Sequence, residues 1–160
     1  MTISVGDKLP DATLYVMGAS GPEAKTTSDL FSGKRVAFFG LPGAFTPTCS
    51  AKHVPGFVEN AGALAEKGID SIICVSVNDA FVMDAWGKDQ DAGDAVVMAS
   101  DGDAEMTKAM GLELDLGGKG FGLRCQRFSM VVNDGIVESI NLEADGGYDV
   151  TSAQHMLANL

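Results

Sequence analysis

The chain has 160 residues, 46% of them hydrophobic, and a formal net charge of −11 at pH 7. This length and composition suit a single globular domain over residues 1–160. So acidic a chain excludes nucleic acid and anionic membranes as partners, and no apolar run approaches the ~20 residues of a membrane span. The first residues, MTISVGDKLPDATL, lack a charged start followed by an apolar run. We therefore expect no secretory signal and a cytoplasmic protein.

The predicted elements of the first half alternate between strand and helix. Arg35–Gly40 is a short apolar run between turn residues, which predicts a buried strand. A loop rich in Pro, Gly and Thr follows, and then a helix whose apolar face repeats from Phe57 to Ala65 and ends at Gly68. Ser71–Asn78 is rich in β-branched residues and predicts a second strand, and a second helix follows from residue 79 to 88.

The second half adds an antiparallel hairpin. Ala95–Ser100 predicts a third strand, followed by a short helix that ends at Gly111. Asn133-Asp134-Gly135 separates two apolar runs, 128–132 and 136–140, as hairpin turns do, and a capped helix over 151–160 ends the chain. The order predicts an α/β fold, a thioredoxin-like sandwich with a central mixed β-sheet flanked by helices.

The glycine-rich stretch Gly117–Gly122 (GGKGFG) invites comparison with a phosphate-binding loop. It matches neither G-x-x-x-x-G-K-[ST] nor G-x-G-x-x-G between a strand and a helix. We therefore expect a flexible loop.

The chain contains three cysteines, Cys49, Cys74 and Cys125, and two histidines, His53 and His155. A small odd number of cysteines argues against a disulfide framework. The scattered positions also lack the paired spacing of zinc ligands, so we expect no metal site.

Cys49 stands where the Pro/Gly/Thr loop meets the start of a helix. Unpaired N–H groups and a partial positive charge at a helix start favour a thiolate over a thiol. Thr46 lies three residues earlier, where its hydroxyl can donate to the thiolate and accept from a substrate. Pro42 and Pro47 stiffen the loop, and Pro55 should kink the helix and ease its unwinding. These residues alone do not distinguish a reactive Cys49 from a buried structural one.

The same segment resembles the active-site signature of the peroxiredoxins, Pro-x-x-x-Thr-x-x-Cys, formed by Pro42, Thr46 and Cys49. The longer string LPGAFTPTCSAKHVPGF is similar to the type II or peroxiredoxin-5-like branch. Further similarity lies in CVSVNDAFVMDAW from Cys74, GLELDL from 111 and RFSMVVNDG from Arg127, so that the resemblance spans nearly the whole chain.

The resemblance implies a thiol peroxidase that reduces hydrogen peroxide and organic hydroperoxides in antioxidant defence, with neither metal nor organic cofactor. Cys49 would be the peroxidatic nucleophile, Thr46 would position the peroxide, and Pro42 would shield the pocket. Arg127 matches the catalytic arginine, and the N–H groups near Gly43 and Cys49 would bind substrate. Fixed donors of this kind stabilise the charge that develops on the leaving oxygen. Arg124 lacks a motif match and remains a possible helper.

The residue that reduces the oxidised Cys49 is left open. Cys74 follows Cys49 by 25 residues, a spacing that resembles the resolving cysteine of plant-type members served by glutaredoxin. A buried core cysteine explains its strand position equally well. Thr151 stands about where mammalian-type members carry their resolving cysteine, which closes that route, and Cys125 has no assigned role. The reductant would be glutaredoxin with glutathione, or thioredoxin, and the resemblance implies a homodimer.

Two other functions compete with the peroxidase. A thioredoxin-like disulfide oxidoreductase would need a C-x-x-C pair, which the sequence lacks. A redox sensor that passes oxidation to a client protein would use the same Cys49 chemistry and differs only in lacking turnover with a reductant.

Overall fold

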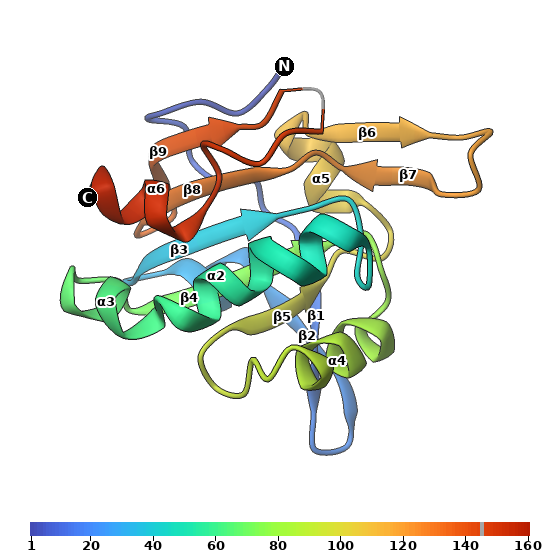
Figure 1. The fold of residues 1–160 in the computed structure, drawn as a ribbon, viewed down its shortest axis with the longest axis horizontal. Helices are drawn as coiled ribbons and strands as arrows, with labels where there is room; N and C mark the ends of the chain where they lie inside the picture. Colours follow the sequence, from blue (N-terminus) through green and yellow to red (C-terminus); the bar gives the residue numbers. More distant parts are fainter. Residues whose placement is uncertain (145) are drawn as a thin grey trace.

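The computed structural model describes residues 1–144 and 146–160, which form a seven-stranded mixed sheet with helices on both faces (Figure 1). The strand order is β2-β1-β5-β4-β3-β8-β9. These strands are β1 (Thr13–Gly18), β2 (Gly21–Thr26), β3 (Arg35–Gly40), β4 (Ser71–Ser76), β5 (Val97–Ser100), β8 (Phe128–Asn133) and β9 (Ile136–Leu142). The central strands β3, β4 and β5 run parallel, and β8 and β9 join antiparallel beside β3. This arrangement confirms the predicted thioredoxin-like sandwich.

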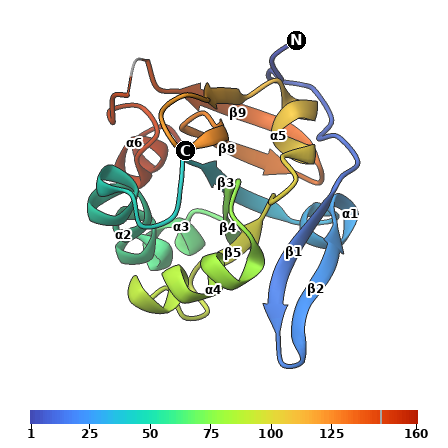
Figure 2. The ribbon, with the colours of Figure 1, turned by 90° about the vertical axis from the view of Figure 1, so that its right-hand side faces the viewer.

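The sheet separates two apolar clusters, because side chains alternate across each strand. Val36 and Phe38 of β3 belong to one cluster, and Ala37 and Phe39 belong to the other. Figure 2 shows α2, α3, α4 and α6 on one face and α1 and α5 on the opposite face. The bounds are α1 (Thr27–Phe31), α2 (Val54–Glu59), α3 (Ala61–Glu66), α4 (Ala80–Asp89), α5 (Glu105–Met110) and α6 (Ala153–Ala158). None of the helices described here is long and apolar enough to cross a membrane.

The structure divides the helix that was expected to continue through Ala65. Asn60 ends α2, and its main-chain and side-chain N–H groups both donate to the Gly56 carbonyl, at 3.1 and 2.8 Å. An asparagine side chain that competes for a helical carbonyl in this way interrupts the regular pattern. The chain then turns into α3.

Two hairpins are additional to the predicted elements. One is β1–β2 at the edge of the sheet, and the other is a separate pair, β6 (Glu113–Leu116) with β7 (Gly122–Cys125). The stretch Gly117–Gly122, expected to be a flexible loop, connects this second pair, and its last residue already pairs with Leu116. The predicted turn Asp134-Gly135 is confirmed: both residues have positive φ, 48° and 80°, as a two-residue hairpin turn requires.

Candidate active site

The loop between β3 and α2 carries the predicted signature, and hydrogen bonds hold its shape. The Ala44 N–H donates to the side-chain oxygen of Asn78 at 3.0 Å, and the same oxygen accepts from Ser76 at 2.6 Å. The Thr46 hydroxyl donates to the Gly43 carbonyl at 2.7 Å. Its proton is therefore engaged within the loop, and its lone pairs remain available to accept a hydrogen bond.

Cys49 begins a π-helical turn, η1 (Cys49–His53), in place of the expected kinked α-helix. The Val54 N–H donates to the Cys49 carbonyl, five residues back. An α-helix that ran on from Cys49 would lack a donor at Pro55, which has no N–H. The π-turn puts the irregularity before the proline, and Pro55 then falls in the first turn of α2, where prolines are tolerated.

Arg127 contacts the sulfur of Cys49 directly. It lies between β7 and β8, and its Nη2 donates to Cys49 Sγ at 3.1 Å. Cys49 is fully buried, so this guanidinium supplies a permanent positive charge where water cannot screen it fully. The structure thus brings together the predicted nucleophile and the predicted arginine from positions 78 residues apart.

His53 holds the other side of the same guanidinium. Arg127 Nη1 lies 2.8 Å from His53 Nδ1, and His53 Nε2 lies 3.0 Å from the Thr151 carbonyl. A guanidinium only donates and a carbonyl only accepts, so His53 must be neutral with its proton on Nε2. Burial and the charge of Arg127 lower the pKa of His53 to about 3, which keeps it in this form.

His53 was not among the predicted site residues, although one sequence signal was available. It follows Cys49 by four residues, which in a helix places both side chains on the same face. The residues that contact its two ring nitrogens come from the link between β7 and β8 and from the segment before α6, and the spacing alone does not reveal them.

Arg124 supports the loop and does not contact the thiol. Its Nε donates to the Phe121 carbonyl at 2.9 Å and its Nη1 to the Pro42 carbonyl at 3.3 Å. A Cβ added at Gly43 would lie 2.8 Å from Arg124 Nη1 and 3.3 Å from the methyl group of Thr46. The absence of a side chain at Gly43 therefore permits this close packing. Pro42, Gly43, Thr46 and Arg124 form one unit beside Cys49.

The three cysteines are free and buried, and they lie in different surroundings. Cys74 on β4 shares its apolar cluster with Cys49, and burial followed by the nearby Cys49 raises the pKa of its thiol well above the usual value. Cys125 belongs to the cluster on the opposite face, where burial raises the pKa of its thiol to about 12. Of the two other cysteines, Cys74 is the one that shares an apolar cluster with Cys49.

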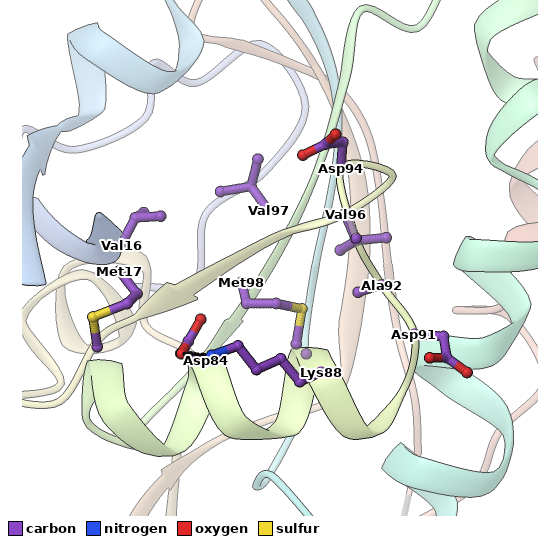
Figure 3. A pocket seen from close by; sticks show the side chains of 12 residues that line it. Val16, Met17, Asp84, Lys88, Asp91, Ala92, Asp94, Val96, Val97 and Met98 are labelled. Carbon is purple, nitrogen blue, oxygen red and sulfur yellow. Dashed lines mark ion pairs between the residues drawn. The ribbon is translucent and has the colours of Figure 1, made fainter. Parts of the chain in front are cut away.

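A cavity of about 680 Å³ lies away from this site, between β1, α4 and β5 (Figure 3). Its lining includes the apolar side chains of Met17 and Met98, and an ion pair of 3.0 Å joins Asp84 and Lys88, which also line it. The lining contains no cysteine or histidine among the described residues, so the cavity offers no group for thiol chemistry. Among all the residues that the structure describes, no cluster of three or more His, Cys, Asp or Glu side chains is arranged to bind a metal.

Comparisons with known proteins identify the family of the chain. Residues 4–157 match the family model described as Redoxin. The chain is 52% identical over 163 residues to Peroxiredoxin-2E, chloroplastic, of Arabidopsis thaliana, which covers 99% of this chain and 70% of that relative. It is 51% identical over 164 residues to Peroxiredoxin-2E-2, chloroplastic, of Oryza sativa subsp. japonica, with 99% and 73% covered.

Solved structures show the same likeness. The crystal structure of reduced Prx3 from Vibrio vulnificus in complex with H2O2 superposes with a TM-score of 0.95 at 46% identity, and 99% of each chain is covered. The names of both plant relatives describe them as chloroplastic, and this contradicts the expectation of a cytoplasmic location.

Proposed function

Because this chain belongs to the type II peroxiredoxins, thiol-dependent peroxidases of the redoxin family with an antioxidant role, we propose that Cys49 is its peroxidatic nucleophile. The observation that carries this assignment is the 3.1 Å hydrogen bond from Arg127 to the Cys49 sulfur. The substrates are hydrogen peroxide and organic hydroperoxides.

The first step is a two-electron oxidation of the sulfur. The Cys49 thiolate attacks one peroxide oxygen in line with the O–O bond, so that an S–O bond forms as the O–O bond breaks. The electron pair of the broken bond leaves on the second oxygen, which takes a proton and departs as water or an alcohol. Arg127 stabilises the charge on that oxygen, the Thr46 oxygen accepts from the peroxide O–H, and the Gly43 and Cys49 N–H groups bind substrate. Pro42 shields the pocket.

The second half of the cycle reduces the sulfenic acid with thiols. A first thiol condenses with it, releasing water and forming a disulfide, and a second thiol then exchanges to free Cys49. We assign the external electrons to glutaredoxin with glutathione, or to thioredoxin. Cys74 is the internal candidate for the first thiol because it shares the cluster of Cys49. Its burial requires η1 to unwind before the two sulfurs meet.

A second copy of the chain would cover the exposed aromatic side chains around the site. Phe45, Phe81 and Phe121 are 53%, 65% and 47% exposed, an unusual condition for phenylalanine. Phe45 lies 6.4 Å from Trp86 on α4, between ring centroids, and α4 also carries Phe81. The Phe121 ring lies against Arg124. The exposure of these three rings supports a homodimer, and Phe81→Glu should raise the fraction of monomer in sedimentation equilibrium.

Peroxide turnover with purified protein tests the assignment. Wild type is assayed with hydrogen peroxide and with an organic hydroperoxide, and the reductant is glutaredoxin plus glutathione, thioredoxin, or glutathione alone. Cys49→Ser should abolish turnover and leave the circular dichroism spectrum unchanged. Residual turnover of the variant above a few per cent of wild type would contradict the role of Cys49. A wild type that oxidises once and is restored by none of the reductants would instead favour a redox sensor.

A further inference from the structure

Glu143, which no motif singles out, anchors the segment that leads into α6. It follows β9 directly. Its Oε2 accepts from the Thr151 hydroxyl at 2.6 Å, the Thr151 N–H at 3.0 Å and the Asp149 N–H at 2.9 Å, and its Oε1 accepts from the Val150 N–H at 3.4 Å. Burial raises the pKa of Glu143, but these hydrogen bonds outweigh the burial and hold that pKa below its usual value. One carboxylate therefore binds three consecutive residues.

The anchored segment fixes the direction of one main-chain carbonyl. Thr151 is fully buried, and its carbonyl accepts from His53 Nε2 at 3.0 Å. The backbone sets the direction of a main-chain carbonyl. Glu143 holds this backbone through the N–H groups of residues 149–151 and through the Thr151 hydroxyl. The carbonyl in turn selects the ring proton of His53, because only the Nε2–H form leaves Nδ1 free to accept.

The chain of hydrogen bonds continues to the reacting sulfur. His53 Nδ1 accepts from Arg127 at 2.8 Å, and the other end of the guanidinium donates to Cys49 at 3.1 Å. A second connection runs through the backbone, because the Glu143 N–H donates to the Arg127 carbonyl at 3.1 Å. Arginine has several rotatable bonds, and holding it in one geometry needs partners that are themselves fixed.

We propose that Glu143 is a positioning residue for the peroxide step, acting through Thr151 and His53 to hold the Arg127 guanidinium at the Cys49 sulfur. This inference rests on the proposed peroxidase function. Glu143 touches neither substrate nor sulfur, and its effect on the rate passes entirely through the guanidinium.

The first experiment measures the second-order rate of Cys49 oxidation by hydrogen peroxide in stopped-flow, together with thermal unfolding of each variant. Glu143→Gln replaces an acceptor oxygen by a donor and should slow the step about tenfold, the scale of one well-placed hydrogen bond. The matched control is Glu138→Gln. Glu138 is a carboxylate on β9 that pairs with Arg35 at 2.9 Å, and its loss should leave the rate unchanged.

Thr151 supplies a second pair of variants that keeps the test decisive if Glu143→Gln fails to fold. Thr151→Val keeps the shape and removes the donor to Glu143, so it should slow oxidation severalfold. Thr151→Ser keeps the hydroxyl and should restore the wild-type rate. Equal rates for Val and Ser at this position would overturn the proposal.

Two further readouts separate positioning from mere stability. In an Arg127→Ala background, Glu143→Gln should cause no additional loss of rate, whereas losses that multiply would show that Glu143 acts by another route.

In ¹⁵N NMR, the ring of His53 should carry its proton on Nε2 in wild type and exchange between both nitrogens in Glu143→Gln. An unchanged tautomer would overturn the proposal. A wild type in which peroxide does not oxidise Cys49 would instead overturn the peroxidase function itself.

Discussion

Replacing His53 by glutamine should flatten the acid dependence of the stability of the protein. Glutamine can accept from Arg127 through its oxygen and donate to the Thr151 carbonyl through its nitrogen, but it does not titrate. In the folded wild type the pKa of His53 is about 3, against about 6.5 for the ordinary group. As the pH falls below about 6.5, His53 binds a proton in the unfolded chain but stays neutral in the folded protein.

The sign and size follow from this difference. The unfolded state binds more protons between these two values, so the stability that neutral His53 contributes is complete above pH 6.5 and falls as the pH is lowered. Below pH 6.5 the free energy of unfolding falls by about 1.4 kcal/mol for each pH unit. Between pH 7 and pH 5 the loss is therefore about 2 kcal/mol. Carboxylates such as Glu143 and Glu138 titrate in both proteins, and their contributions cancel in the difference.

The assay is urea unfolding of reduced wild type and His53→Gln at half-unit steps from pH 7 to pH 5. We expect the free energy of unfolding of wild type to fall by about 2 kcal/mol more than that of the variant over this range. Parallel curves would refute the reasoning, because they would mean that His53 binds a proton as readily in the folded protein as in the unfolded chain. The neutral acceptor assigned to Nδ1 would then be wrong.

Four other substitutions test groups around the site. Arg127→Ala should slow Cys49 oxidation by roughly 10² to 10³, the scale for losing one electrostatic donor, while Arg124→Ala should cost much less in the same stopped-flow assay; equal losses would contradict the separation of roles. Cys74→Ser should prevent the Cys49–Cys74 disulfide that peptide mass mapping would detect in oxidised wild type and speed over-oxidation to sulfinic acid; unchanged over-oxidation would leave Cys74 a core residue. Gly43→Ala should displace the Arg124 side chain and slow the oxidation of Cys49, with little change in the melting temperature. A wild-type rate would show that the loop tolerates the added carbon.

The sequence revealed the buried strands most clearly, for a physical reason. Arg35–Gly40 lies at the centre of the sheet with both faces covered, so its apolar run has no other explanation, and its bounds are confirmed. The edge hairpin is different. Gly21–Thr26 is half-exposed or exposed throughout and contains proline and charged residues, as edge strands do, so neither alternation nor an apolar run marks it.

The site was predictable only in part because its contacts join distant segments. The signature around Cys49 is local, and resemblance added Arg127. Charge alone does not separate Arg127 from Arg124, which lies three residues earlier and supports the loop. The partners of His53 lie 74 and 98 residues away, and Glu143 reaches the site only through Thr151 and His53, so these roles follow from tertiary packing rather than from spacing.

Cys125 lies in a different apolar cluster from Cys49 and Cys74, and this affects when a disulfide between Cys49 and Cys125 can form. In the folded protein Cys49 and Cys125 are both buried and belong to different apolar clusters, so we expect a disulfide between them to require the structure to open. An unfolded chain has no such barrier, and its thiols pair according to the length of the loop that they close. A Cys49–Cys125 disulfide would therefore indicate molecules that were oxidised while they were unfolded or partly open. Reducing conditions during synthesis and refolding should therefore lower the fraction of molecules that carry it.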